Sequence, residues 1–291
     1  MIGLGLLGTA LAERLLGAGF EVVVYNRTRE KAEPLVARGA RWSDRPLAEC
    51  NRAVVCLYRT EHVVELLAQM ETDLRRGQAI IDTTTGEPNE TAALGARLAK
   101  QGISYLETPI AASSEQTRRG EALAILGGER SAIDANADLL DAIAPRRFHV
   151  GPWGAAARMK LVNNLILGLN RVALAEGLLL AEGAGLDPSA ALEVLKNSNS
   201  RSAVMDVKGR KMVERDFAVE ARLAQHRKDV DLILAEGRRA GLDLPVSSLH
   251  RELLVAGEEQ GLSDADNSAI IAAIEAVARR RSASSQQGSA S

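Results

Sequence analysis

The chain has 291 residues, of which 46% are hydrophobic, and its 36 basic and 38 acidic residues leave a formal net charge of −2. This length accommodates one large or two ordinary domains with a full core, and the balanced charge argues against a nucleic-acid partner. The only cysteines are Cys50 and Cys56, and no apolar run reaches the roughly 18 residues of a membrane span. We therefore expect a cytoplasmic protein without disulfide bonds, signal peptide or membrane association.

A glycine cluster of the form G-x-G-x-x-G opens the chain. The first glycine permits a tight turn, the second lets backbone N–H groups approach a pyrophosphate, and the third lets the next helix pack closely on its strand. We expect that helix to run from Leu7 to about Gly17 and to present its positive end to the anion. The cofactor contacts predicted here are Gly3, Gly5, Leu6, Leu7 and Gly8.

The first strand of this pattern is unusually short. Only Met1 and Ile2 precede the first glycine, although a buried parallel strand needs about five residues. In a doubly wound sheet this strand is central, so a short one leaves its neighbours without ladder partners. Either the gene begins upstream of Met1 or the sheet tolerates a truncated strand. We expect the former, and reduced stability for the chain as given.

A β-rich run, Glu21–Tyr25, follows the first helix and should end beside the adenosine ribose of a dinucleotide. Sites for NAD usually place an acidic residue here, which accepts a hydrogen bond from the ribose 2′-OH. This chain instead has Asn26, Arg27 and Thr28, which supply neutral donors and a fixed positive charge suited to a 2′-phosphate. The segment therefore predicts NADP in preference to NAD.

Up to about residue 150, short β-rich runs alternate with helical stretches such as Glu61–Met70 and Asn89–Gln101. This alternation predicts a mainly parallel sheet with helices on both faces, which is a Rossmann-type α/β domain over residues 1–153. The candidate strands are Glu21–Tyr25, Arg52–Leu57, Gln78–Asp82, Ser104–Thr108, Ala122–Gly127 and Arg147–Val150.

Beyond residue 153 the pattern is helical only, which predicts an all-α domain over residues 154–281. A long helix, Ala155–Gly183, joins the two domains, and it is apolar around much of its circumference. A second subunit should cover part of that surface, so we expect a homodimer. The Ser/Gln/Gly/Ala tail, 282–291, should be disordered. The other predicted helices are Pro188–Lys196, Glu220–Ala240, Pro245–Glu259 and Asn267–Arg281.

Lys160 and Asn164 lie four residues apart near the start of the long helix, so they share one face, and Arg171 continues the stripe. Asn164 stands in an apolar run, and a buried amide costs free energy unless it is paired. A lysine beside a nicotinamide can protonate a carbonyl oxygen while hydride arrives at the carbon, and an asparagine can orient both groups. An ordinary solvated helix face is the alternative interpretation of the lysine.

Four stretches together resemble the β-hydroxyacid dehydrogenase family, which includes 3-hydroxyisobutyrate dehydrogenase and 6-phosphogluconate dehydrogenase. Asp82–Thr85 also resembles the family's D-x-S-T stretch near the nicotinamide ribose. The resemblance covers nearly the whole chain in the family's order. The four stretches are the glycine cluster, Glu107–Ser113 with Gly120 and Gly127–Gly128, Gly154–Lys160 with Asn163–Asn164, and Lys228–Val230.

The resemblance implies an NADP-dependent oxidoreductase that interconverts a small 3-hydroxy acid and its semialdehyde or keto form. It implies that Lys160 is the general acid/base, that Asn164 orients it, and that Lys228 contacts both the cofactor and an anionic substrate. The further cofactor contacts that it implies are Leu57, Tyr58, His62 and Thr85, and the substrate-loop contacts are Ala111, Ala112 and Ser113.

The substrate loop departs from the family pattern. Relatives have Ser-Gly-Gly after a Pro-Val or Pro-Ile pair, where the serine and backbone amides hold the substrate carboxylate. Ala111 and Ala112 occupy the first two of these positions here. The backbone N–H groups remain, but a hydroxyl is lost. Either Ser113 and Ser114 substitute for this hydroxyl or the carboxylate is held differently. The identity of the substrate therefore stays open.

Two other functions fit parts of this pattern. An imine reductase would share the architecture and the Asn-Arg-Thr signature, but such enzymes usually lack a lysine at the position of Lys160. A non-catalytic nucleotide-binding scaffold would explain the altered loop, but not the retention of Lys160, Asn164 and Lys228 together. The four histidines have no ligand spacing, so no metal site is predicted.

Overall fold

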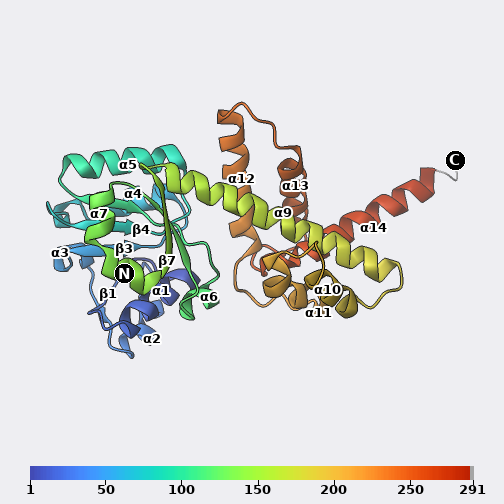
Figure 1. The fold of residues 1–291 in the computed structure, drawn as a ribbon, viewed down its shortest axis with the longest axis horizontal. Helices are drawn as coiled ribbons and strands as arrows, with labels where there is room; N and C mark the ends of the chain where they lie inside the picture. The colour runs from blue at the N-terminus through green and yellow to red at the C-terminus, as the bar shows by residue number, and fades with distance from the viewer. Residues whose placement is uncertain (289–291) are drawn as a thin grey trace. The chain divides into compact units, whose positions relative to one another are not determined.

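The computed structural model describes the backbone of residues 1–288 and the side chains of residues 1–279. The chain divides into two compact units, the first spanning Met1–Lys160 and the second beginning at Leu161. The first unit alternates strands and helices, and the second consists of helices (Figure 1). The break between the units falls inside the long helix, after Lys160, whereas the sequence pattern placed it at the start of that helix.

Strands that are mainly parallel form the centre of the first unit. Five of them make one sheet in the order β3-β4-β5-β6-β7, and β1 pairs with β2. All of these pairings are parallel except that of β5 with β6. The strands expected from the sequence are present, and β2 is an additional one, too short for a periodic pattern. The bounds are β1 (Val23–Val24), β2 (Arg41–Trp42), β3 (Arg52–Val55), β4 (Ala79–Asp82), β5 (Ser104–Glu107), β6 (Leu123–Gly127) and β7 (Arg146–Gly151).

The first three residues lie between β1 and β3. Ile2 forms isolated parallel bridges to Tyr25 on one side and to Val55 on the other. The α-ammonium group of Met1 donates a hydrogen bond of 2.6 Å to the carbonyl oxygen of Val23. This short segment therefore supplies ladder partners to the strands on both of its sides.

Helices cover both faces of the sheet. Successive strand residues point to opposite faces, and the apolar side chains on each face pack against helices. Val54, Ile81 and Leu106 share one apolar core with side chains of α1, α2, α7 and α8. Ala53 and Ile80 belong to a second core with α3, α4 and α5. The bounds are α1 (Leu6–Gly17), α2 (Glu33–Val36), α3 (Pro46–Glu49), α4 (Thr60–Gln69), α5 (Pro88–Lys100), α6 (Ser114–Arg118), α7 (Arg130–Ala135) and α8 (Ala137–Ile143).

The second unit has its own apolar core, which includes Leu174, Leu192, Val230, Leu254 and Ile274. The helices expected from the sequence are present. The π-helical turn Met205–Gly209 and α11 were not predicted, because each is too short for a periodic pattern. The bounds are α9 (Ala155–Gly183), α10 (Pro188–Lys196), α11 (Arg210–Glu214), α12 (Leu223–Arg239), α13 (Pro245–Glu259) and α14 (Ile270–Gly288).

Helix α14 runs further than the sequence suggested. It continues through residue 288, into the 282–291 segment for which composition predicts disorder. Extending an existing helix needs only one more set of dihedral angles per hydrogen bond, whereas starting a helix is costly. Residues 289–291 lie outside the described part of the chain.

Among the described helices, α9 is the one whose length and hydropathy would allow it to cross a membrane. This corrects the expectation that no apolar run is long enough. Core helices of globular domains pass the same test. Two basic side chains of α9, Lys160 and Arg171, are buried inside the protein, and burying such groups in a bilayer would be costly. We therefore interpret α9 as a core helix.

Candidate active site

The glycine cluster forms the turn that enters α1. Gly3 has a φ of +90°, and a Cβ atom there would lie 2.2 Å from the carbonyl oxygen of Cys56. A Cβ atom on Gly8 would lie 2.0 Å from the carbonyl oxygen of Gly3. Gly5 is the N-cap of α1 and has open space around it, and no side chain caps the helix. The positive end of α1 is therefore open to an anion, as a pyrophosphate site requires.

Asn26 connects the glycine loop to the loop that follows β1. Its Oδ1 accepts a hydrogen bond from the Leu4 amide at 2.9 Å, and its Nδ2 donates to the carbonyl oxygen of Thr28 at 2.8 Å. The sequence suggested that this side chain is a donor to the cofactor. The structure gives it a second role, which is to hold the two loops together, and it leaves one N–H of the amide for a ligand.

A groove of about 340 Å³ lies at the carboxyl ends of β1 and β3. Lys31, Glu65 and Gln69 line it and were not predicted as cofactor contacts. Lys31 lies four residues after Arg27, in the short 3₁₀ turn Arg29–Ala32 that follows the loop, and its position as a second cation close to Arg27 in the sequence was the signal that could have identified it. The predicted cofactor residues that the groove brings together are Gly3, Asn26, Arg27, Thr28, Leu57, Tyr58 and His62.

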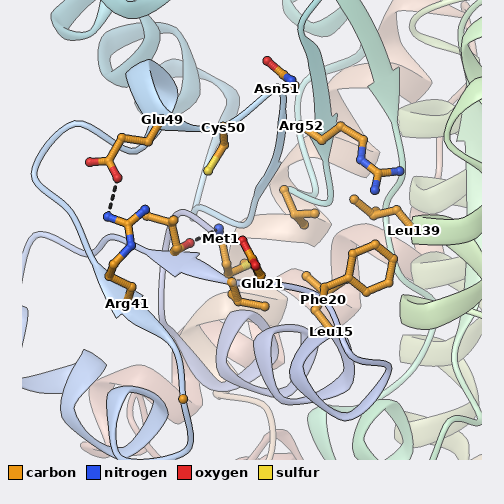
Figure 2. A pocket seen from close by; sticks show the side chains of 14 residues that line it. Met1, Leu15, Phe20, Glu21, Arg41, Glu49, Cys50, Asn51, Arg52 and Leu139 are labelled. Carbon is orange, nitrogen blue, oxygen red and sulfur yellow. Dashed lines mark hydrogen bonds and ion pairs between the residues drawn. The ribbon is translucent and has the colours of Figure 1, made fainter.

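A larger cavity of about 500 Å³ lies at the opposite, amino-terminal ends of the strands (Figure 2). Its cationic side chains already have partners: Arg41 forms an ion pair with Glu49, and Arg52 forms one with Asp138. Ligands of doubly wound sheets bind outside the carboxyl ends of the strands. The smaller groove is therefore the better candidate for the cofactor.

The carboxyl ends of β3 and β4 are joined by side chains of the Asp-Thr-Thr-Thr stretch. The Leu57 amide donates to Oγ1 of Thr84 at 3.0 Å, and the Thr84 amide donates to Oδ1 of Asp82 at 2.9 Å. Oδ2 of Asp82 accepts from the Tyr105 hydroxyl at 2.8 Å, while burial raises the pKa of this carboxyl. Thr85, which follows this network, is partly exposed.

The substrate loop offers fewer free amides than the sequence suggested. The Ala111 amide donates to the carbonyl oxygen of Leu123 at 2.8 Å, as part of a ladder with β6. Ser113 is the N-cap of α6 and forms a capping box with Gln116, in which its amide donates to the Gln116 side chain and its hydroxyl oxygen accepts from the Gln116 amide. Within the described residues, Ala112 alone of the three has an amide that donates to no protein group. A carboxylate held by all three amides is therefore excluded in this conformation.

Lys160 lies against the same loop. It stands in the second turn of α9 and is only 8% exposed. Its Nζ donates a hydrogen bond of 2.8 Å to the carbonyl oxygen of Ile110, the residue immediately before Ala111. The first unit thus places the predicted general acid beside the predicted substrate loop.

In the second unit, Asn164 and Lys228 share a partner that was not predicted. Nδ2 of Asn164 donates to Oδ2 of Asp229 at 2.9 Å, and Nζ of Lys228 forms an ion pair with Oδ1 of the same carboxylate at 2.9 Å. Lys228 is only 1% exposed, and burial of an unpaired charge would be costly. The position of Asp229 directly after Lys228 was the available signal for it.

Arg171 extends this buried polar region of the second unit. It is 3% exposed, and its Nε and Nη1 atoms have no hydrogen-bond partner among the described residues. Burial lowers the pKa of this guanidinium to about 10, and the charges of Asp266 and Asp229 act in the opposite direction. Within the side chains of residues 1–279, no group of three His, Cys, Asp or Glu residues could hold a metal ion.

The sequence is similar to several characterised proteins. It is 28% identical over 285 residues to glyoxylate/succinic semialdehyde reductase 2 of Arabidopsis thaliana, covering 96% of this chain and 80% of the relative. It is 27% identical to 2-(hydroxymethyl)glutarate dehydrogenase of Eubacterium barkeri, covering 93% and 92%. It is also 26% identical to the human cytokine-like nuclear factor N-PAC, covering 92% of this chain and 50% of that protein.

Solved structures share the fold. The structure of Psf3 in complex with NADP⁺ and 2-OPP has a TM-score of 0.86 and 28% identity, covering 94% of this chain and 98% of that one. The 3-hydroxyisobutyrate dehydrogenase of Salmonella typhimurium has a TM-score of 0.86 at 21% identity, covering 93% and 97%. An imine reductase from Pseudomonas sp. has a TM-score of 0.65 at 21% identity, covering 94% and 97%.

Family models match both parts of the chain. Residues 1–151 match the NAD-binding domain of 6-phosphogluconate dehydrogenase, which is more than half of the chain. Residues 154–274 match the domain described as NAD-binding of NADP-dependent 3-hydroxyisobutyrate dehydrogenase. Together with the glycine cradle and the buried Lys160, these matches show that the chain belongs to the β-hydroxyacid dehydrogenase family, among the 3-hydroxyisobutyrate dehydrogenase-like proteins.

Proposed function

We propose that this protein is an NADP-dependent oxidoreductase that interconverts a small 3-hydroxy acid and its semialdehyde or keto form. The observation that carries this proposal is the buried Lys160, whose Nζ donates to the Ile110 carbonyl oxygen beside the substrate loop. The same unit contains an open dinucleotide cradle at Gly3, Gly5 and Gly8. A proton donor and a hydride carrier in one unit are what reduction of a carbonyl requires.

Lys160 has the chemistry of the proton donor. When bound, the nicotinamide supplies or accepts the hydride. In the reducing direction the Lys160 ammonium group gives a proton to the carbonyl oxygen of the substrate, and in the oxidising direction the neutral amine takes it back. The hydrogen bond to Ile110 fixes the side chain, which restricts the positions that the ammonium group can adopt.

Asn164 and Lys228 are proposed to bind the substrate, with Lys228 also contacting the cofactor. The Asp229 carboxylate holds both side chains in place in the second unit. An ammonium group and an amide can together bind a carboxylate and a hydroxyl oxygen. We infer a small anionic substrate, and the names of the relatives, a succinic semialdehyde reductase and a 2-(hydroxymethyl)glutarate dehydrogenase, support that class.

The proposed preference for NADP rests on the charge of the groove at the end of β1. Arg27 and Lys31 both line it, and two cations suit a 2′-phosphate better than the ribose 2′-OH of NAD. The complex of Psf3 with NADP⁺, at 28% identity, supports the same cofactor.

An assay of purified protein tests this function. Reduction of a panel of semialdehydes, keto acids and cyclic imines would be followed with NADPH and with NADH. Lys160→Ala should lower kcat by about 10²- to 10⁴-fold, since it removes general acid catalysis, while NADPH binding persists. Lys100→Ala is the matched control, because Lys100 is an exposed lysine of the same unit. Full turnover in Lys160→Ala would refute the assigned mechanism.

A nucleotide-binding scaffold without catalytic activity is the second candidate. The observation that favours it is the substrate loop, where Ala111 lacks the family hydroxyl and donates its amide to Leu123. One relative, N-PAC, is named as a nuclear factor and not as an enzyme. NADPH binding without turnover on any member of the panel would select this candidate, and turnover on cyclic imines alone would select an imine reductase.

We also propose that the protein is a cytoplasmic homodimer. On the part of α9 in the second unit, Val162 is 54% exposed and Ile166 is 56% exposed. They lie four residues apart and so share one face of the helix. Apolar side chains exposed in this way on a helix favour cover by a second subunit.

A further inference from the structure

Glu107 caps the helix that carries Lys160. Its carboxylate comes from the end of β5, and Oε1 accepts a hydrogen bond from the Gly154 amide, while Oε2 accepts from the Ala157 amide at 3.1 Å. The first amides of a helix have no partner within the helix. In most helices a residue at the helix start supplies this partner. Here the partner of the Ala157 amide is a residue fifty positions earlier in the sequence.

Neighbouring contacts fix the same turn. Trp153 donates from its ring Nε1 to the carbonyl oxygen of Tyr105 at 2.8 Å, and its ring packs where a Cβ atom on Gly95 would lie, 2.5 Å away. Gly154 has a φ of +88°, which favours glycine. The turn that leads into α9 is therefore held by β5 and α5. The contacts are made by the Trp153 ring and by the amides of Gly154 and Ala157.

Lys160 stands one turn beyond these contacts. Glu107 holds the amides of the first turn, and Ile110, three residues after Glu107, receives the Lys160 ammonium group. The segment Glu107–Ile110 is therefore attached to α9 at both of its ends. A shift of the helix start would move the lysine relative to the substrate loop.

We propose that Glu107 is a positioning residue, whose negative charge holds the first turn of α9 and thereby holds Lys160 against the Ile110 carbonyl. An ionised carboxylate accepts from several amides at once. A protonated one turns one oxygen into a donor, which can no longer accept from an amide. The charged form also suits the positive end of the helix. Loss of the charge therefore loosens the turn and the lysine that follows it.

The environment places the titration of Glu107 in the working range of pH. Burial raises the pKa of its carboxyl to about 7, in opposition to the hydrogen bonds from the α9 amides, and the charge of Asp82 adds to the increase. Asp82 is its register partner on β4, Tyr105 lies on its own strand, and β6 contributes only Gly127, whose Cβ would lie 2.9 Å from Oε2. Asp82 and Tyr105 are acids, so neither lowers the pKa of Glu107. The cations of the first turns of α9 are Arg158, which donates to Asn89, and Lys160, which donates to the Ile110 carbonyl oxygen.

The test is Glu107→Gln, which keeps the size of the side chain and removes the charge. This inference rests on the proposed role of Lys160. Because a misplacement of about 1 Å can cost 10²-fold in rate, we expect kcat to fall about 10- to 100-fold with an unchanged KM for NADPH. Wild-type kcat should decline as the pH falls through about 7, and the variant should lack this decline. A variant that retains full kcat and the wild-type pH profile overturns the proposal.

Glu129→Gln is the matched control, because Glu129 is the N-cap of α7 and its side chain makes no capping hydrogen bond. Combination with Lys160→Ala separates positioning from a direct effect. If Glu107 acts through the lysine, Glu107→Gln should change the residual activity of that background less than two-fold. An equal loss in both backgrounds overturns the proposal.

A readout without catalysis separates this inference from the proposed function. The rate of Lys160 acetylation by acetic anhydride, measured by mass spectrometry relative to Lys100, should rise several-fold in Glu107→Gln and stay constant in Glu129→Gln. An unchanged rate overturns the positioning role even if Lys160 is catalytic. A raised rate supports it even if Lys160→Ala proves fully active, which would contradict only the proposed function. If Glu107→Gln does not fold, Glu107→Asp, which keeps the charge on a shorter side chain, is measured instead. The rate of Lys160 acetylation in this variant should exceed that of the wild type, and an unchanged rate would overturn the positioning role.

Discussion

The Leu4 amide donates a hydrogen bond of 2.9 Å to Oδ1 of Asn26, and this bond joins the glycine loop to the end of β1. The same Asn26 side chain donates to the Thr28 carbonyl oxygen. Asn26 thus shapes the loop that carries Arg27 as well as lying in the groove itself. Asn26 therefore has two roles: it is a neutral side chain beside the expected ribose, and it holds the loop together. Different substitutions should separate these roles.

Asn26→Asp should reverse the cofactor preference. It keeps the hydrogen bond from the Leu4 amide but loses the one to the Thr28 carbonyl oxygen, because a carboxylate cannot donate. The carboxylate can still accept from Leu4, but it repels a 2′-phosphate and can accept from a ribose 2′-OH. We expect NADPH binding to weaken about 10- to 100-fold and NADH binding to improve, as measured by fluorescence titration. Asn26→Ala loses both hydrogen bonds, about 1–3 kcal/mol in total, and should weaken both cofactors. A similar loss for both cofactors in Asn26→Asp would show that the charge at this position does not select the cofactor.

Arg27→Ala should weaken NADPH binding by about 1.5–3 kcal/mol, the range for hydrogen bonds to charged groups, and leave NADH binding nearly unchanged. Lys31→Ala should act in the same direction with a smaller effect, since an ammonium group makes fewer directed bonds to a phosphate. Arg29→Ala is the control, because the Arg29 guanidinium lies over the Trp42 ring at 5.3 Å and Arg29 does not line the groove. Isothermal titration would measure all three, and equal losses for both cofactors would contradict the assignment.

Local patterns in the sequence were sufficient for the architecture of this chain. The glycine cluster, the strands at β3 to β7 and the helices α10 and α13 each show a spacing that a single backbone conformation explains. The conformations of Gly3 and Gly8 follow from the same spacing, because a turn that tight leaves no room for Cβ atoms. The groove residues after β1 were also predictable, since the carboxyl ends of parallel strands meet at one edge.

Contacts between segments that are far apart in the sequence could not be predicted from local patterns. Ala111 was expected to offer its amide to a substrate, but the loop runs antiparallel to β6 and gives that amide to Leu123. Glu107 has no local capping pattern, because the helix that it caps starts far along the chain. Asp229 pairs with Asn164 only because α9 and α12 pack together in the second unit. Each of these contacts requires the tertiary structure.

The homodimer should depend on the exposed apolar face of α9. Ile166→Glu places a charge beside Val162 on that face, and burial of an unpaired carboxylate opposes association. We expect light scattering to give a dimer for the wild-type protein at micromolar concentration and a monomer for the variant. Glu176→Gln, on an exposed position of the same helix, should remain a dimer. A wild-type protein that is monomeric under these conditions would refute the assembly.

Two buried histidines of the second unit form a site with a predictable response to acid. The rings of His226 and His250 lie 5.1 Å apart, and they contact α9 at Gly168, where a Cβ atom would lie 2.7 Å from Cε1 of His250. Burial, and then the positive charge of Arg171, lower the pKa of His250 from 6.5 to about 4. The folded protein therefore keeps this imidazole neutral at a pH where the unfolded chain binds a proton.

This difference makes His250 destabilising in acid. Between about pH 6.5 and pH 4 the unfolded state binds the proton and the folded state does not, so the free energy of unfolding should fall as the pH falls, by up to about 3 kcal/mol from this group. His250→Gln should show a shallower loss over that range, because glutamine does not titrate. Urea denaturation at a series of pH values would measure it. His149→Gln is the matched control for the substitution itself, because His149 is an exposed histidine. A slope in His250→Gln as steep as that of the wild type would show that a group other than His250 controls the acid response.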